Sequence, residues 1–320
     1  MSDKLTLTPQ ERYALEAEQT AFRIIELRAS PVRGDFDAAH LKEINLRIFQ
    51  DLPGLGFDDV KPGEYRPTVA AGNDWTKTRG LETVDAPSNV AYSRMDKAAQ
   101  MRLDKVLKNA DPANLSKLKT AEFTQTLGKL YAELDYIHPF SDGNSRTLRE
   151  FTRQLAEASG YTLDWERFCK SAAGRDILYI ARDRSVNELA LEHIQHIGTK
   201  RDVMLTMDQF AGNRDLPDLL RDAIRPTRAI AFERLSEADA LRKHPDLNEA
   251  FKTMRSAAKY FEAKLPGNDA VQHEALQAVR KQLQTMLDQG ETKNFRSPSK
   301  SHEAQKPIIE QKKSIPDLER

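Results

Sequence analysis

The sequence predicts a mainly α-helical protein, in which a helical bundle with a small β-hairpin flap is followed by a helical C-terminal region. Two observations support this fold class. Apolar residues recur at steps of three and four along most of the 320 residues, which is the period of amphipathic helices. The one long interruption, between Pro53 and Tyr92, is rich in Pro, Gly, Asn and Thr. We therefore expect one helical domain with an irregular insertion.

Successive helical patterns should pack into one bundle. The pattern from Thr120 to Ile137 is the most regular and ends directly before His138. In the first pattern, Leu15, Phe22 and Ile25 share one face. The predicted helices run from about Thr8 to Ala29, Asp37 to Gln50, Arg94 to Lys108, Thr120 to Ile137, from near Ser145 onward, Asp164 to Ala173, and Asp176 to Ile197.

The interruption between Pro53 and Tyr92 should be non-helical. It contains a short β-type run at Thr68-Val69-Ala70, a turn dipeptide at Gly72-Asn73, and a large apolar side chain at Trp75 in a polar context. These features favour a hairpin or lid. An ordinary long surface loop is the alternative.

The sequence pattern of the last third of the chain predicts a separate helical region. One helix is expected from about Asp215 to Leu241, with a potential break at Pro226, and a helical hairpin from Leu247–Leu265 and Val271–Leu287. Their apolar stripes indicate a core, and a partner-binding face is the alternative. From residue 290 the chain has few apolar residues, so we expect a disordered tail, or an export or docking signal.

Composition narrows the function classes. The formal net charge is zero, so nothing global indicates nucleic acid or an anionic membrane as a partner. A single cysteine, Cys169, excludes an internal disulfide framework and a cysteine-based zinc site. No signal peptide or membrane-spanning apolar run is visible. We expect a cytoplasmic protein, and a secretion system that reads another signal could still export it.

The segment from His138 to Arg149 combines a base, a carboxylate, an anion-binding turn and two arginines in twelve residues. Pro139 disfavours the α region for the residue before it, so a helix should end there and place the imidazole in a loop. Gly143 allows positive φ, and Asn144 and Ser145 are favoured at helix N-termini. The backbone N–H groups of this turn should form an anion cradle.

Three arginines follow this turn on one helical face. Arg146, Arg149 and Arg153 stand at i, i+3 and i+7, and an apolar stripe with the same spacing occupies the opposite face: Leu148, Phe151 and Leu155. Cations near a helix N-terminus oppose the helix dipole, at a cost that a bound polyphosphate would remove. The alternative is a solvated basic face. The adjoining His, Asp and Gly-Asn turn favour a phosphate site.

The segment closely resembles the Fic family signature, HPFx(D/E)GNGRxxR. The matching residues are His138, Pro139, Phe140, Asp142, Gly143, Asn144, Arg146 and Arg149. Ser145 is the one departure, because the family usually has glycine there. The likeness extends downstream to Trp165, covers about residues 10 to 200, and is similar to toxin-like bacterial Fic proteins paired with a small antitoxin or fused to secretion domains.

The resemblance implies a Fic-type helical bundle and a domain order. Residues 1–200 would be the Fic domain, with a core at 30–175 and the flap at about 62–92, which begins at the Pro-Gly-x-x-Arg stretch ending in Arg66. A helical region at 201–289 and the tail at 290–320 would follow. The flap of Fic proteins lends a strand edge to a target protein.

The chemistry of AMP transfer assigns a role to each residue of the signature, and the resemblance implies the same roles. His138 would be the general base for a Ser, Thr or Tyr hydroxyl of a target protein. Asp142 would hold Mg²⁺ of Mg-ATP. Gly143, Asn144 and Ser145 would cradle phosphate, and Arg146 and Arg149 would neutralise the β- and γ-phosphates. Phe140 is assigned to the core.

Several questions stay open at this point. The side chain of Ser145 could crowd a phosphate or donate a hydrogen bond to it. The protein could be a nucleotide-binding docking module, or could transfer another phosphate-containing group. The inhibitory helix pattern of the family, (S/T)xxxE(G/N), is absent from the sequence. Control by a separate small antitoxin that carries the inhibitory glutamate is therefore expected.

Overall fold

The computed structural model describes residues 7–291, which form two compact units. Of the described residues, the first unit contains 7–230 together with 288–290, and the second contains 231–287 together with 291. This division lies later in the chain than the boundary near residue 200 expected from the sequence. Most of the expected tail, residues 292–320, lies outside the described residues.

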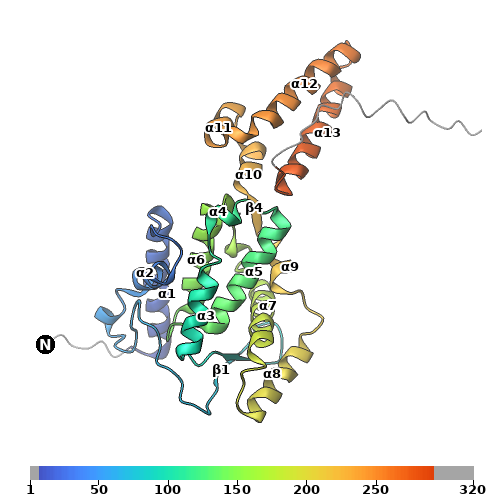
Figure 1. Cartoon of the computed structure of the whole chain (residues 1–320). Helices are drawn as coiled ribbons and strands as arrows, with labels where there is room; N and C mark the ends of the chain where they lie inside the picture. Colours follow the sequence, from blue (N-terminus) through green and yellow to red (C-terminus); the bar gives the residue numbers. More distant parts are fainter. Residues whose placement is uncertain (1–6, 292–320) are drawn as a thin grey trace, which may run out of the picture. The chain divides into compact units, whose positions relative to one another are not determined.

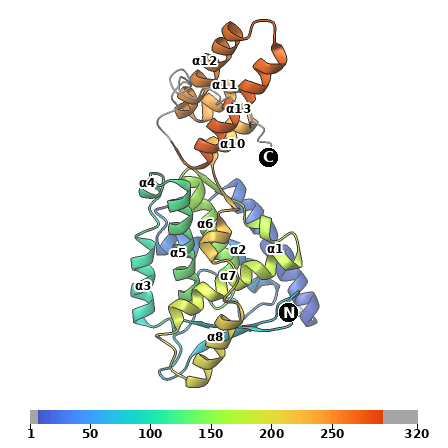
Figure 2. The ribbon, with the colours of Figure 1, turned by 90° about the vertical axis from the view of Figure 1, so that its right-hand side faces the viewer.

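The first unit is a helical bundle built around α5, Thr120–Ile137, as predicted (Figures 1 and 2). The apolar stripe of α5 is buried, and α3, α6 and α7 pack against this helix. The other helices of this unit are α1 (Pro9–Ala29), α2 (Ala38–Phe49), α3 (Lys97–Leu107), α4 (Pro112–Leu115), α6 (Asn144–Ala158), α7 (Ala172–Ala190), α8 (Ile197–Gln209) and α9 (Leu216–Leu220).

The interruption between α2 and α3 forms the predicted hairpin. Strands β1 (Trp75–Arg79) and β2 (Ser88–Tyr92) pair antiparallel, with Trp75 opposite Tyr92 and Arg79 opposite Ser88. The expected β-type run at Thr68-Val69-Ala70 is wrong, because these residues are in no strand and Val69 instead binds Arg94. A short 3₁₀ helix, Pro53–Leu55, begins the interruption.

Two other local expectations are corrected. Phe22 and Ile25 of α1 are 56% and 64% exposed, because α1 turns Thr20 and Leu27 inward instead. The short helix expected near Asp164 is a 3₁₀ turn, Trp165–Phe168, whose cap is the Asp164 carboxylate.

The segment expected as one helix from Asp215 to Leu241 is divided. Strand β4, Ile224–Pro226, interrupts it and pairs antiparallel with β3, Tyr161–Leu163. Pro226 cannot continue a helix, and here it ends the strand that separates α9 from α10, Thr227–Arg234. The sequence predicted the break but not the strand, because the partner strand is distant: the central pair, Thr162 and Arg225, is 63 residues apart (225 minus 162).

The second unit is entirely helical in its described residues. It continues from α10 through α11 (Glu237–Lys243) and a 3₁₀ turn (Pro245–Leu247) to α12 (Asn248–Lys264) and α13 (Asp269–Asp288). The predicted hairpin across Pro266-Gly267-Asn268 is confirmed. Buried Phe232 and Phe251 pack against each other in this unit, with ring centroids 5.0 Å apart and ring planes tilted by 48°.

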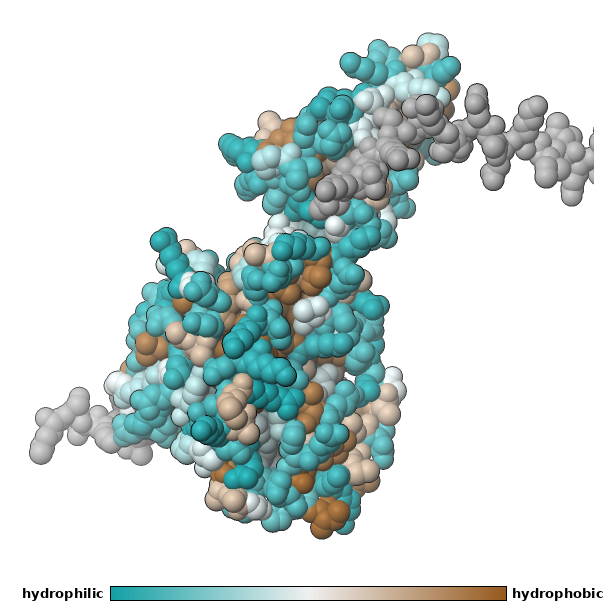
Figure 3. Space-filling view, viewed as in Figure 1, coloured by the Kyte–Doolittle hydropathy of each residue, from teal (hydrophilic) through white to brown (hydrophobic). Residues whose placement is uncertain are grey.

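The face of the first unit seen in Figure 3 is mostly hydrophilic, with several hydrophobic areas between the hydrophilic ones. None of the helices between residues 7 and 291 has the length and apolar character needed to cross a membrane.

Candidate active site

The turn between α5 and α6 is fixed by the buried side chain of Asn144 and by the ring of Phe49. The Asn144 amide accepts a hydrogen bond from Phe140 N–H (3.0 Å) and donates one to Phe140 C=O (2.7 Å). Gly143 has φ 74°, and a Cβ there would lie 2.0 Å from the Cζ atom of Phe49. Only glycine fits this position, because the backbone is left-handed and a ring closes the space.

Helix α6 begins at Asn144, with Gly143 as its N-cap. Asn144 and Ser145, which are favoured N-cap types, are here the first two residues of the helix, and Gly143 takes the N-cap position. Gly143 offers no side-chain cap to the first turn, and the first N–H groups of a helix lack intrahelical partners. These N–H groups, with the positive end of the helix dipole, can bind an anion.

His138 follows the last residue of α5 and has left-handed backbone angles, φ 48° and ψ 63°. As Pro139 predicted, the helix ends at Ile137. The imidazole is 5% exposed and lies against the rings of Trp75 and Tyr92, at centroid distances of 5.1 and 4.0 Å. A left-handed non-glycine residue is strained, and such strain persists where the surroundings hold it, often at functional sites.

The two nitrogens of His138 face different groups. Nδ1 lies 3.2 Å from the carbonyl oxygen and 3.4 Å from the carboxylate Oδ1 of Asp135. Because both are acceptors, Nδ1 carries the proton of the neutral ring, which leaves Nε2 as an acceptor. Burial lowers the pKa of His138 to about 4, although Asp135 opposes this shift. At neutral pH the ring is an unprotonated base with its lone pair on Nε2.

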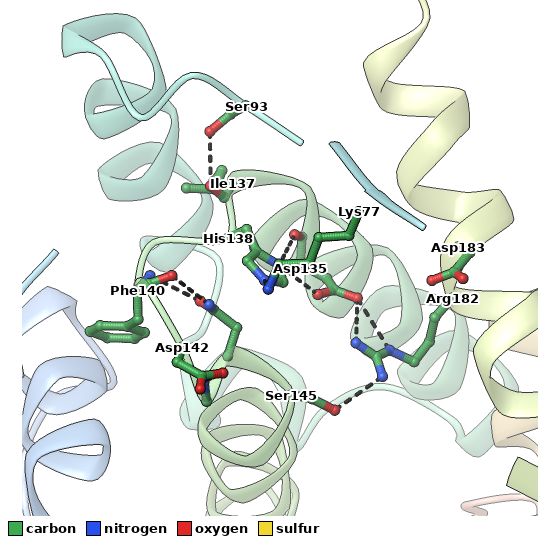
Figure 4. A network of polar contacts seen from close by, with 12 residues as sticks. Lys77, Ser93, Asp135, Ile137, His138, Phe140, Asp142, Ser145, Arg182 and Asp183 are labelled. Carbon is green, nitrogen blue, oxygen red and sulfur yellow. Dashed lines mark hydrogen bonds and ion pairs between the residues drawn. The ribbon is translucent and has the colours of Figure 1, made fainter. Parts of the chain in front are cut away.

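Asp135 belongs to a buried network that the sequence analysis did not identify (Figure 4). Its carboxylate accepts hydrogen bonds from Nε (3.1 Å) and Nη2 (2.8 Å) of Arg182 in α7, and both side chains are 1% exposed. Burial alone raises the pKa of Asp135, but the charge of Arg182 and the contact with His138 outweigh it, and the net pKa is lowered. This carboxylate is therefore negative at neutral pH.

The same Arg182 reaches the phosphate turn. Its Nη1 donates a hydrogen bond to Ser145 Oγ at 3.0 Å. Ser145 was expected either to crowd a phosphate or to donate a hydrogen bond to it, whereas in the structure its hydroxyl accepts one. Ser145 thus ties the turn to the carboxylate that contacts the base.

The three arginines of α6 differ in their partners. Arg146 forms an ion pair with Glu16 of α1 and donates to Thr20 Oγ1 (2.9 Å). Arg153 pairs with Glu150 and Glu157. Arg149 has no carboxylate partner within residues 7–291, and its Nη1 lies 3.5 Å from Cys169 Sγ.

All three arginines of α6 line a cavity of about 160 Å³, with Arg28, Glu150 and Cys169 among the other lining residues. The basic face that was expected on this helix therefore lines this cavity. Of its three arginines, only Arg149 keeps its charge free of a carboxylate in the described part of the chain.

Asp142 is exposed at the rim of the turn, where its Oδ1 accepts a hydrogen bond from Gly143 N–H (2.6 Å). Between residues 7 and 291 no group of three His, Cys, Asp or Glu side chains could hold a metal ion. A single exposed carboxylate beside an anion cradle fits Mg²⁺, which prefers one or two carboxylates with phosphate oxygens and water. It does not fit a metal held by protein ligands alone.

The flap offers one open strand edge. Side chains of α7 and α8 satisfy the far edge of β2: Asn187 binds Ala91 N–H and Asn89 C=O, and Thr206 accepts from Asn89 N–H. The backbone N–H and C=O groups of residues 88, 90 and 92 must then point towards β1. Their partners in β1 are residues 79, 77 and 75. Residues alternate in an antiparallel ladder, so the N–H and C=O groups of Thr76 and Thr78 lie on the outer edge.

Three residues around the base come from distant parts of the chain. Arg66 donates to the carbonyl oxygens of His138 (2.7 Å) and Ser93 (2.6 Å). Lys77 of β1 approaches the imidazole, and Arg182 reaches it through Asp135. Only Asp135, at i−3 from His138 on the same helix, had a local signal, because that spacing brings two side chains together.

The site combines a buried histidine, a helix N-terminus without a side-chain cap and a glycine turn on a helical bundle. This combination can accommodate an anion such as a phosphate group. Residues 35–156 match the Fic/DOC family.

Two relatives with assigned names are similar to part of the chain. The protein adenylyltransferase VbhT of Bartonella schoenbuchensis is 32% identical over 162 residues, which are 49% of this chain and 29% of that protein. The probable protein adenylyltransferase Fic of Escherichia coli is 29% identical over 174 residues, 54% of this chain and 75% of that protein. The chain thus spans less than a third of the length of VbhT.

Among solved structures, the N-terminal Fic domain of a Bartonella quintana effector with bound ADP is similar, with a TM-score of 0.44 and 22% identity. The match covers 71% of this chain and 91% of that chain.

The contact between Ser145 and Arg182 predicts a stability effect. Ser145→Ala removes the acceptor of a buried charged donor, so the free energy of unfolding should fall by about 1–3 kcal/mol. Exposed Ser141 in the same turn is the matched control. Ser141→Ala should change the free energy of unfolding by less than about 0.5 kcal/mol. Urea unfolding measures both values. Equal effects of the two variants would contradict this assignment.

The low pKa of His138 predicts a pH effect on stability. Its folded value of about 4 lies below its ordinary value of 6.5, so below pH 6.5 the unfolded chain binds more protons. Stability should therefore fall as the pH falls from 6.5 towards 4, by about 2–3 kcal/mol at about pH 4.5. Urea unfolding of wild type and His138→Asn at about pH 7 and 4.5 isolates this contribution. The same loss in both proteins would show that His138 does not titrate as proposed.

Proposed function

We propose that this chain is a protein adenylyltransferase, which transfers AMP from Mg-ATP to a Ser, Thr or Tyr hydroxyl of a target protein. The observation that carries the proposal is the neutral Nε2 of His138, held next to an uncapped helix N-terminus. A base and an anion cradle side by side suit attack of a hydroxyl on a phosphate. The names of VbhT and of the Escherichia coli relative support the same activity.

The base works through its two nitrogens. As the hydroxyl oxygen attacks the α-phosphorus, its proton moves to Nε2 of His138. The ring then becomes positive, and the carboxylate of Asp135, 3.4 Å from Nδ1, stabilises that charge. Without this carboxylate, burial would make the imidazole an even weaker base, because burial disfavours the charged ring.

The phosphates lie, in this proposal, on the first turn of α6. The N–H groups following Gly143 hold phosphate oxygens, and Arg149 neutralises the terminal phosphates because no carboxylate within the described chain competes for it. Arg146 is assigned the same role, and it must exchange its ion pair with Glu16 to perform it. When bound, Mg²⁺ at Asp142 would offset the charge of the leaving pyrophosphate.

The remaining assignments concern partners and location. A target protein would add a strand to the outer edge of β1. A separate small antitoxin would carry the inhibitory glutamate, since the chain lacks the family pattern for it. The bacterial cytoplasm is the proposed location, with export into another cell as the alternative.

Transfer of AMP should depend on His138. Incubation of the purified protein and candidate targets with ATP and Mg²⁺ should add the mass of AMP, measured on intact protein. His138→Ala should abolish this addition while ATP affinity stays within about threefold, because the imidazole acts on the hydroxyl and not on the nucleotide. Transfer at the wild-type rate by His138→Ala would contradict the assignment of His138 as the general base.

Target docking should depend on the backbone of Thr76. Thr76→Pro removes an N–H from the outer edge of β1, while the ladder to β2 stays intact. Modification of a protein target should fall at least roughly tenfold, with nucleotide affinity unchanged. Thr76→Val is the control, because it keeps both the N–H and the β-branched shape. If both variants modify the target equally, the strand edge is not the docking site.

A further inference from the structure

Lys77 of β1 is the nearest cation to the reactive nitrogen of the base (Figure 4). Its Nζ lies 3.4 Å from Nε2 of His138. Since Nδ1 carries the ring proton, the ammonium group donates to the lone pair of Nε2. The side chain is partly buried and lies near the ring of Trp75, with Nζ 5.3 Å from the centroid. Lys77 therefore stands where the attacking hydroxyl must arrive.

The charge of Lys77 lacks a counterion in the described part of the chain. Burial is the largest cause of a lowered pKa at this lysine, and the charges of Arg79 and Arg66 act in the same direction. Asp142 and Asp135 oppose that shift from a distance, and neither forms an ion pair with Lys77. A partly buried ammonium group with only a neutral ring as its partner is costly, and an anion bound beside it would remove the cost.

We propose that Lys77 is a second catalytic residue, whose ammonium group leaves Nε2 and binds the α-phosphoryl oxygens when a nucleotide and a target hydroxyl occupy the site. This inference rests on the proposed AMP transfer. In that reaction the bond between the hydroxyl oxygen and the α-phosphorus forms, and the bond to pyrophosphate breaks. The hydroxyl proton passes to His138, and Lys77 stabilises the negative charge on the phosphoryl oxygens.

The position of Lys77 distinguishes it from the other cations nearby. Arg66 is held by the carbonyl oxygens of His138 and Ser93, and its guanidinium stacks on Trp75 at 3.6 Å. Arg149 lies on α6, where its Nε donates to Ser145 C=O. Neither contacts the imidazole of His138. Among the described residues, Lys77 is the cation whose charged group lies within 3.4 Å of the atom that receives the proton.

The first test compares transfer rates of three variants. Lys77→Met keeps the length of the stem over Trp75 and removes the charge, so kcat should fall roughly 100-fold, the usual loss for one such donor. Lys77→Arg keeps the charge and should retain most of the rate. The control is Lys42→Met, because the ammonium of Lys42 also lies on a ring, that of Tyr65 at 4.0 Å, and it should transfer as wild type. A normal rate in Lys77→Met would overturn the proposal.

The second test uses pH, which a packing role would not affect. The wild-type rate should fall as Lys77 loses its proton, at a pH below the ordinary lysine value of about 10.4. Lys77→Arg should show no such fall, because arginine stays charged. The measured quantity is the difference between the pH–rate profiles of wild type and Lys77→Arg. Titration of groups on the target protein affects both profiles equally and does not contribute to this difference. Identical alkaline profiles would overturn the assignment.

A third measurement does not depend on transfer. Wild type should bind AMP more tightly than adenosine. In Lys77→Met the ratio of the adenosine Kd to the AMP Kd should fall at least roughly tenfold, because the variant lacks one charged phosphate contact. If wild type adds no AMP to any protein but the ratio narrows, the proposed function fails while the phosphate contact of Lys77 stands. If wild type transfers AMP and the ratio is unchanged in Lys77→Met, the role of Lys77 fails alone.

Discussion

The ion pair between Asp135 of α5 and Arg182 of α7 joins two of the helices around the site. Both side chains are 1% exposed, so each has lost its hydration and depends on the other for its charge. Removal of one partner from such a pair leaves an uncompensated buried charge and costs about 3–5 kcal/mol. The pair is weak support for stability by itself, but it fixes a carboxylate against Nδ1 of His138 and a guanidinium against Ser145.

This arrangement explains how the base tolerates its surroundings. Burial, Lys77 and Arg66 all disfavour a positive imidazole, and Asp135 is the group that opposes them. The result is a ring that stays neutral at rest and still has an adjacent negative charge for the moment it gains a proton. A histidine exposed to solvent would be partly protonated near neutral pH and would need no such partner.

The sequence predicted what is local and missed what is distant. The run from His138 to Arg149, the buried stripe of α5 and the hairpin all follow from neighbouring residues, through helix period, turn chemistry and signature spacing. Arg182 lies 44 residues beyond His138 and Lys77 lies 61 before it, and no periodic pattern marks either as a neighbour of the base. Their placement depends on how α7 and β1 pack against α5, which a single sequence does not specify.

Helix α7 carries a further constraint in two adjacent residues. Arg182 contacts Asp135 and the phosphate turn, whereas Asp183 binds Arg79 of β1 (3.1 Å) and Ser88 of β2 (2.7 Å). One helical turn therefore anchors the base on one side and the flap on the other. Because Lys77 lies on the same strand as Arg79, the position of its ammonium group over Nε2 depends on that anchor. Any displacement of α7 would change the carboxylate behind the base and the cation in front of it together.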